Sequence, residues 1–236
     1  MNFLQLVNLA RSEAGAAGGV LTTLQGVQTL ETNRFISWVN TEWQMLQSEH
    51  PDFQFLRQTS QFTCTPEQAM YTPQQACATV DGTINTAANM ADWKHDSFRI
   101  STAGQNYADE QIVGFMIWDQ YRNLYQYGQM RFQYSRPVVI TIDPQKNLWL
   151  GKSPDQQYVT VYEYYQVPQS LLLDTDTPIM PARFHPLIAY RALRAYGQYM
   201  YAPEVLQRAN AVISKMNADL CNDQLPAIMD GPPLVN

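Results

Sequence analysis

Apolar residues near the start of the chain recur with the period of an α-helix. Four of them share one face of residues 3–14, namely Phe3, Val7, Ala10 and Ala14. This face predicts a first helix, which the glycines that follow it end. A second helix is predicted from about Thr32 to Ser48. Its apolar line consists of Phe35, Ile36, Val39, Trp43 and Leu46.

The helical period returns near the C-terminus and predicts two further helices. The apolar face of the first consists of Phe184, Leu187, Ile188, Ala192, Ala195, Tyr196 and Tyr199. The second begins at Pro203, because proline is tolerated in a first helical turn. Its apolar line consists of Val205, Ala209, Val212, Ile213, Met216 and Leu220.

Four arginines make this helix pair locally basic. Arg191 and Arg194 fall opposite the apolar face, so we expect both to be solvated. Arg183 and Arg208 add to the positive charge. An acidic partner, or DNA in a channel, would be the functional explanation of the same pattern.

Between these helix pairs the pattern changes to that of β-strands. Strands are predicted at residues 57–62, 98–100, 112–117, 138–142, 148–150 and 158–165. The turn at Asp143-Pro144 makes residues 138–150 a hairpin. Asp119 is predicted to cap a short helix that Gly128 ends. The polar residues 83–90 predict a loop.

This order of elements predicts an α+β fold, with terminal helices packed as a bundle and a central antiparallel β-sandwich-like insertion. We expect residues 1–51 and 181–221 to form the helical bundle and residues 52–180 the β-rich domain. Residues 222–236 are expected to form an extended C-terminal arm, since spaced apolar residues with three prolines make a poor helix.

Composition adds that charge is scarce and net negative. Only 15% of the 236 residues are charged, against about 25% in typical soluble domains. Gln and 14 Tyr supply much of the polarity, and surfaces rich in Tyr and poor in Lys suit large protein–protein contacts. The net charge of −6 disfavours binding to nucleic acid by phosphate neutralisation. The negative net charge has two possible explanations: the chain lines a channel through which DNA passes without adhering, or the charge only keeps the protein soluble.

Cysteine usage and the N-terminus indicate the compartment. Cys64, Cys77 and Cys221 leave at least one thiol unpaired, and no Cys or His spacing fits a metal site. We therefore expect a reducing compartment and no bound metal or cofactor. The first residues lack the basic region and apolar run of a signal peptide. No stretch approaches the roughly 18 apolar residues of a membrane span, so we expect a cytosolic product with no membrane partner.

Titratable residues predict no catalytic site. His50, His95 and His185 are far apart, and no nucleophile motif accompanies them. His185 is expected to cap or pack at the start of the penultimate helix. Asp174 and Asp176 lack the further ligands of a calcium loop, and a role in a turn explains them better.

Two other patterns have structural explanations. The glycines at positions 15, 18 and 19 lack the Lys-Ser/Thr of a phosphate loop. Tyr162, Tyr164 and Tyr165 could stack on bases, but no basic residues are interleaved with them. Packing within a sheet is the favoured interpretation of these tyrosines.

Several short segments occur in an order that resembles a known family. They are Leu21–Gly26, Trp43–Gln47, His50–Leu56, Tyr121–Gly128, Arg136-Pro137, Ser153–Asp155 and Met180–His185 leading into Ala192-Leu193. From Tyr158 onward the order is strand, proline-bounded turn, helix pair and short proline-rich tail. Together these segments resemble the bacteriophage head-to-tail adaptor proteins, also called connector or tail tubular A-like proteins.

The resemblance implies a non-enzymatic structural protein of the virion neck or tail, assembled in the host cytoplasm. Such proteins form a ring of about twelve copies that joins the portal to a tail or nozzle protein and continues the DNA channel. Double-stranded DNA passes through it during genome ejection without specific binding. The family has no catalytic residues to carry over.

In related adaptors a C-terminal arm contacts the portal, which suggests the same role for the tail of this chain. The expected portal-binding residues are Leu225, Ile228, Met229, Pro232, Pro233, Leu234 and Val235. The alternative for this segment is a frayed terminus.

Other functions stay open at this point. A tail terminator or tail-completion protein would bind the tail rather than the portal. A virion-associated lytic enzyme would need paired carboxylates in a cleft, and Asp143, Asp155 and Glu163 give no convincing pair. The negative net charge disfavours a binder of single-stranded nucleic acid.

Overall fold

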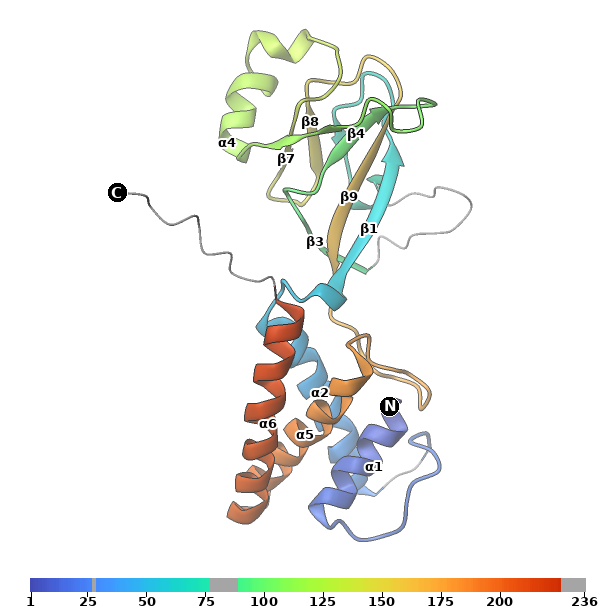
Figure 1. The fold of residues 1–236 in the computed structure, drawn as a ribbon, viewed down its shortest axis with the longest axis vertical. Helices are drawn as coiled ribbons and strands as arrows, with labels where there is room; N and C mark the ends of the chain where they lie inside the picture. The colour runs from blue at the N-terminus through green and yellow to red at the C-terminus, as the bar shows by residue number, and fades with distance from the viewer. Residues whose placement is uncertain (27–28, 77–88, 226–236) are drawn as a thin grey trace, which may run out of the picture. The chain divides into compact units, whose positions relative to one another are not determined.

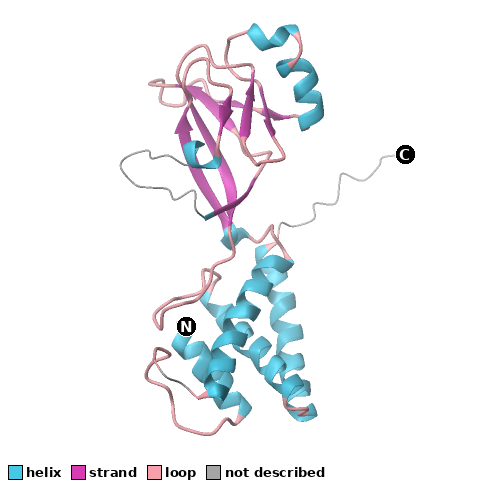
Figure 2. Cartoon of the chain, turned by 180° about the vertical axis from the view of Figure 1, so that it is seen from behind, coloured by secondary structure: helices cyan, strands magenta, loops and turns pink. Residues whose placement is uncertain are grey.

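The computed structural model describes residues 1–26, 29–76 and 89–225, and the chain forms two compact units (Figure 1). Unit 1 is built from residues 1–56 together with the chain from residue 168 onward, and unit 2 from residues 57–167. Figure 2 shows that helices dominate unit 1 and strands dominate unit 2. This combination confirms the predicted α+β class. Residues 168–180, expected in the β-rich domain, belong to unit 1.

The described residues of unit 1 form four helices and two short 3₁₀ turns. The helices are α1 (Phe3–Ala14), α2 (Leu30–Glu49), α5 (His185–Tyr199) and α6 (Pro203–Gln224), and the turns are η1 (Gln54–Leu56) and η5 (Ala182–Phe184). The side chains of Asn2 and Gln5 each accept a hydrogen bond from the other's backbone N–H, which satisfies two donors where α1 begins. Gly15 ends α1 in the left-handed conformation, with φ of 66°.

Helix α5 is the centre of unit 1. It contacts α1, α2 and α6, and its buried residues, among them Leu187, Ile188 and Leu193, lie around much of its circumference. At Gly197 an added Cβ would lie 3.0 Å from Cγ of Leu206. The missing side chain therefore lets α6 approach α5 closely.

The expectation that Arg191 faces solvent is wrong. Its side chain is buried, and Nη2 donates to both carboxylate oxygens of Glu49 on α2 at 2.7 Å. Arg194 pairs with Glu42 of the same helix at 3.5 Å. The other two arginines of the C-terminal helix pair also form ion pairs, Arg183 with Asp223 and Arg208 with Glu13. These four side chains thus do not form a free basic surface.

Residues 57–76 and 89–167, the described part of unit 2, form two sheets. The strands are β1 (Arg57–Thr63), β2 (Met70–Tyr71), β3 (Met90–Trp93), β4 (Arg99–Thr102), β5 (Gln111–Ile112), β6 (Gly114–Phe115), β7 (Val139–Ile142), β8 (Leu148–Gly151) and β9 (Tyr158–Gln166). The first sheet has the order β1-β9-β4-β5, with β3 also paired to β9, and the second has the order β2-β8-β7-β6. Each pairing is antiparallel except β6–β7, which is parallel. A short helix, α3 (Pro73–Ala76), follows β2.

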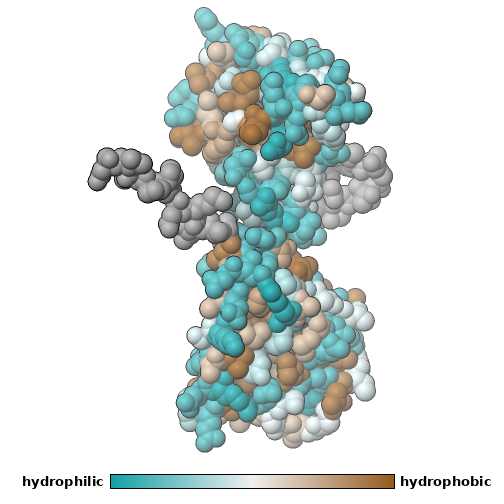
Figure 3. Space-filling view, in the orientation of Figure 1, coloured by the Kyte–Doolittle hydropathy of each residue, from teal (hydrophilic) through white to brown (hydrophobic). Residues whose placement is uncertain are grey.

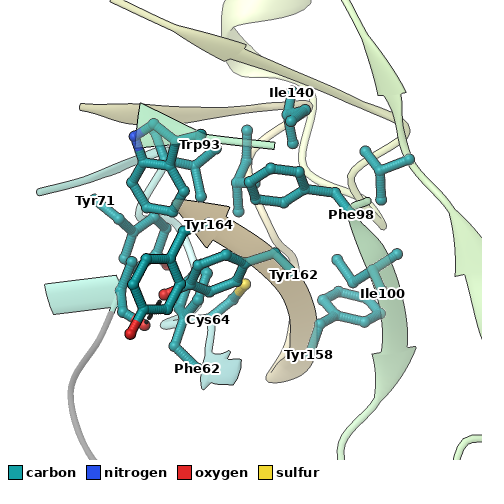
Figure 4. Close-up of a cluster of buried hydrophobic side chains, with 14 residues drawn as sticks. Phe62, Cys64, Tyr71, Trp93, Phe98, Ile100, Ile140, Tyr158, Tyr162 and Tyr164 are labelled. Atoms are coloured by element: carbon teal, nitrogen blue, oxygen red, sulfur yellow. Dashed lines mark hydrogen bonds between the residues drawn. The ribbon is translucent and has the colours of Figure 1, made fainter. Parts of the chain in front are cut away.

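The core of unit 2 is aromatic and draws residues from strands of both sheets (Figure 4). Along β9 every second residue is buried, and these residues are Tyr158, Thr160, Tyr162 and Tyr164. The hydroxyl of Tyr162 donates to the carbonyl oxygen of Ala76 at 3.0 Å. This burial confirms that Tyr162 and Tyr164 pack within the sheet.

Two expectations in the middle of the chain are wrong. Residues 112–117 do not form one strand, because β5 joins the first sheet and β6 the second, with Val113 buried between them. Asp119 is not a cap but lies inside helix α4 (Trp118–Tyr121), whose N-cap Ile117 makes no side-chain hydrogen bond. Most of the loop predicted at 83–90 lies outside the described residues.

Candidate interaction surface

A helical crossover connects the parallel strands β6 and β7. Parallel neighbours cannot be joined by a tight turn and need a longer connection. Residues 116–138 supply it, folded as α4, η3 (Arg122–Gln126) and η4 (Gln129–Phe132). We call these residues the crossover.

Tyr121 fixes the crossover to the second sheet. Its side chain is 2% exposed, and its hydroxyl donates to the carbonyl oxygen of Leu150 in β8 at 2.9 Å. Burial raises the pKa of Tyr121 above its usual range, so the phenol stays protonated and remains a donor. Its ring stacks on those of Trp118 and Tyr125.

Gly151 of β8 lies directly under this anchor. A Cβ at this position would be 2.9 Å from Cε2 of Tyr121, 3.0 Å from Cγ2 of Val139 and 3.1 Å from Cδ2 of Tyr125. Real Cβ atoms hardly ever approach other atoms so closely. A glycine here is therefore a condition for the close packing of the crossover on the sheet.

The crossover exposes several large apolar side chains. Of twenty exposed large hydrophobic residues in the described chain, nine lie between residues 112 and 138. Figure 3 shows hydrophobic side chains gathered on the part of unit 2 that carries α4. We define the crossover surface as the exposed apolar residues of the crossover, namely Ile117, Leu124, Tyr127, Met130, Phe132, Tyr134 and Val138. Contiguous exposed apolar surface on a soluble protein commonly marks an interaction site.

A pocket of about 390 Å³ opens beside the crossover surface. Aromatic side chains supply much of its lining, including Tyr121, Tyr125, Tyr127, Tyr134 and Trp149. Such a pocket can accept an apolar side chain from a partner, which is how interface anchors are typically seated.

Two arginines of the crossover, Arg122 and Arg131, form no ion pair among the described residues, although Asp119 acts on Arg122 electrostatically and the Tyr127 hydroxyl accepts from its Nη2 at 2.8 Å. Arg122 lies over the ring of Tyr127 with its guanidinium carbon 5.3 Å from the centroid, and Arg131 lies over Phe132 at 5.7 Å. By contrast, nine of the other Lys and Arg residues form ion pairs: Arg57, Lys94, Arg99, Arg136, Lys146, Arg183, Arg191, Arg194 and Arg208. The crossover surface thus combines apolar side chains with two arginines that form no ion pair among the described residues.

Unit 1 has an exposed apolar turn of its own, between α5 and α6. Tyr199, Met200 and Tyr201 are 49%, 52% and 91% exposed. Tyr201 has a φ of 52°, a conformation that glycine or asparagine adopts at less cost. The guanidinium of Arg34 lies 4.4 Å from the ring centroid of Tyr199. Each unit therefore carries at least one exposed apolar surface.

The predicted portal-binding arm is described only at its first residue. Helix α6 continues to Gln224, three residues further than predicted, and Leu225 is its half-buried C-cap. Ile228, Met229, Pro232, Pro233, Leu234 and Val235 lie outside the described residues. The crossover surface was not predicted, although the aromatic and arginine-containing run of residues 121–134 was a visible signal.

The residues considered for chemistry have structural roles. His185 packs where α5 begins, with its Nε2 2.9 Å from the carbonyl oxygen of Met180. Asp174 accepts from the Thr23 hydroxyl at 2.6 Å and from the Leu24 backbone N–H at 3.0 Å. Within residues 1–26, 29–76 and 89–225, no group of three or more His, Cys, Asp or Glu side chains could hold a metal ion.

Asp143 organises the β7–β8 hairpin that the sequence predicted. Its carboxylate accepts from the backbone N–H groups of Gln145 and Asn147 and from the side chains of Asn147 and Trp149. Burial alone would raise the pKa of Asp143, but these hydrogen bonds outweigh it and hold the pKa below its usual range.

Two further findings concern membrane-spanning helices and similarity to known sequences. None of the described helices is long and apolar enough to cross a membrane. The sequence model of a family described as SU10 adaptor protein matches residues 1–231. No curated protein matches the chain at a significant level.

Proposed function

Because the chain belongs to the SU10 adaptor protein family, a family of bacteriophage adaptors, we propose that it forms a ring that joins the portal to the tail and continues the DNA channel. It is a structural adaptor of the virion. The match over residues 1–231, which covers both units, is the observation that carries this proposal. We propose a purely structural role, with no catalytic step.

Two features of the structure support a ring. A subunit of a ring contacts its two neighbours through two different faces. The chain has exposed apolar side chains on both units, at the crossover surface and at the α5–α6 turn. The two surfaces are formed by different residues, as such contacts require.

The same proposal includes passage of double-stranded DNA without specific binding. The net charge is −6, and a wall that repels phosphate keeps DNA from adhering. The arginines of the C-terminal helix pair support this view, because each has a carboxylate partner in unit 1 and is partly neutralised.

The first experiment is to measure the native mass of the chain alone and mixed with the portal protein of the same virus. We expect the portal complex to gain about one copy of this chain per portal subunit. Self-assembly into rings or tubes without portal binding would instead favour a tail terminator or tail-completion protein. A monomer that ignores the portal would contradict the adaptor ring and reopen the lytic-enzyme alternative.

We further propose that the arm binds the portal through its apolar residues after α6. Since α6 ends at Gln224, a chain truncated after Leu225 keeps every described helix. We expect this variant to fold normally but to lose portal binding in the native-mass experiment. Full binding by the truncated chain would rule out the arm as the portal contact and leave the ring proposal standing.

A further inference from the structure

We propose that the crossover surface is the face through which one copy of this chain contacts the next copy in the ring. The inference rests on the ring of the proposed function and names the surface that builds it. The crossover spans residues 116–138, and seven exposed apolar residues along it make up the crossover surface.

The crossover is anchored to the second sheet. Tyr121 is hydrogen-bonded to β8, Gly151 allows the crossover to sit tightly on the sheet, and β6 and β7 fix its two ends. The backbone that carries the apolar side chains is therefore held at Tyr121 and at both ends before binding. A surface organised in advance loses less conformational entropy when a partner covers it.

The crossover surface also carries positive charge. Arg122 and Arg131 form no ion pair among the described residues, and only Arg122 has a carboxylate, Asp119, that acts on it electrostatically, so a well-matched partner offers acidic groups around an apolar contact. Apart from these two arginines, the chain carries 21 acidic residues against 13 basic ones. A second copy is thus an acidic partner.

The number of copies in a ring favours a neighbouring copy as the partner. In a closed ring every copy presents the same exposed apolar surface. A neighbouring copy is the partner that is present at every position, whatever the symmetry of the portal or the tail. The pocket beside Tyr127 and Tyr134 provides a seat for one apolar side chain of that neighbour.

Site-specific photo-crosslinking in assembled virions tests this assignment. A photo-reactive amino acid is introduced at position 132, where the natural Phe132 is 73% exposed. The matched control carries it at position 107, where Tyr107 of the same unit is 51% exposed. We expect position 132 to give an adduct of two 27.0 kDa chains and position 107 to give none. An adduct with a different virion protein, or no adduct in particles that contain the variant, would overturn the proposal.

A charge-reversal pair provides a second test that does not depend on crosslinking. We expect Arg122→Glu with Arg131→Glu to lower the number of copies per particle by about tenfold or more. Arg122→Lys with Arg131→Lys keeps the positive charge, and its number of copies per particle should stay within about twofold of that of the unsubstituted chain. Normal near-UV circular dichroism of both variants excludes misfolding. If the glutamate variant were present in particles at the same copy number as the unsubstituted chain, the proposal would be overturned.

The portal experiment is read independently of these two. Adducts between copies without portal binding would support the crossover contact while refuting the portal partner. Portal binding with position 132 crosslinked to another protein would refute the crossover contact and leave the adaptor role intact.

Discussion

Arg191 lies inside the helical unit with its hydrogen bonds concentrated on one nitrogen. Nη2 donates to both oxygens of Glu49, while Nε and Nη1 are buried without a partner in the described chain. The guanidinium side chain is 5% exposed, whereas that of Glu49 is 39% exposed. The two partners therefore depend on each other unequally, because only the carboxylate retains access to water.

This inequality predicts an asymmetric response to mutation. Glu49→Ala leaves the buried guanidinium without its hydrogen-bonded carboxylate, with only the electrostatic attraction of Glu42, and should lower the free energy of unfolding by about 3 kcal/mol. Arg191→Met fills similar volume with an apolar chain and should cost only about 1 kcal/mol, since Glu49 remains hydrated. Urea unfolding followed by circular dichroism measures both. Glu13→Ala removes the partner of the half-exposed Arg208 and serves as the control, with a loss below about 1 kcal/mol. Equal losses for the two Arg191–Glu49 variants would contradict this account.

His185 predicts a loss of stability in mild acid. Burial, and next the nearby amino group of Met1, lower its pKa below the ordinary value of 6.5. The unfolded chain then binds more protons than the folded one once the pH falls below about 6.5. Stability is therefore full above that pH and declines as the pH falls from 6.5 through the folded-state pKa.

We expect His185→Gln to reduce this pH dependence, because its amide can still donate to Met180 but does not titrate. The slope attributable to His185 is at most about 1.4 kcal/mol per pH unit. Urea midpoints of both proteins between pH 7.5 and 5.5 provide the comparison. An unchanged slope in the variant would exclude His185 as the group responsible.

At the scale of elements, close approach between a helix and a strand sets the shape of the crossover. Gly151 leaves less room for a Cβ than ordinary packing requires. Gly114 in β6, which is separated from β8 by β7 in the same sheet, differs, since a Cβ there would meet its nearest atoms at 3.8 Å. The two glycines thus form a natural comparison of a crowded and an open position.

Gly151→Ala should destabilise unit 2 by about 1–3 kcal/mol, because Tyr121 and Tyr125 must move away from the sheet. Gly114→Ala should change stability by less than about 0.5 kcal/mol. Thermal unfolding gives the stabilities, and the fluorescence of Trp118 and Trp149 reports whether the crossover has shifted. A Gly151→Ala protein as stable as the Gly114→Ala protein would show that the crossover adapts without strain.

How far sequence predicts these elements depends on whether the signal is local. The long helices and strands β7, β8 and β9 show a repeated pattern of apolar and polar residues within a short stretch of sequence, and the structure confirms these elements. Arg191 was misassigned because its partner, Glu49, comes from another helix. The short β5 and β6 were merged because their separation depends on which sheet each one joins.

The candidate site was less predictable than the fold. Exposure of Phe132 and its neighbours depends on how the crossover packs on β8, which no local pattern encodes. The resemblance to adaptors came from short segments spread along the chain and identified the protein class. It did not indicate which surface makes contacts.

At the scale of the whole molecule, unit 2 is an insertion between helices of unit 1. Arg57 at its start pairs with Tyr165 near its end, so the two connections to unit 1 leave from neighbouring strands. An insertion whose ends are adjacent can be removed without separating the parts that flank it.

We expect residues 57–167 to fold by themselves, with dispersed nuclear magnetic resonance signals and cooperative unfolding. The remainder, with a short Gly-Ser linker from Leu56 to Pro168, should keep its helical circular dichroism. A fragment of residues 89–167 is the control. It lacks β1, which pairs with β9 over seven residues, and should not fold. An unstructured 57–167 fragment would mean that unit 2 needs unit 1 to fold.

The insertion also sets the order of events during synthesis. Helices α1 and α2 both pack on α5, which the ribosome produces only after the whole of unit 2. Domains generally fold as units, and those that emerge first fold first. Helices α1 and α2 therefore lack their packing partner α5 while unit 2 is synthesised and folds. When β9 pairs with β1, the end of unit 2 lies beside its start, where the chain leaves the first helices. A nascent-chain chaperone could therefore bind either helix during this interval, and α1 for the longest time because it is synthesised first.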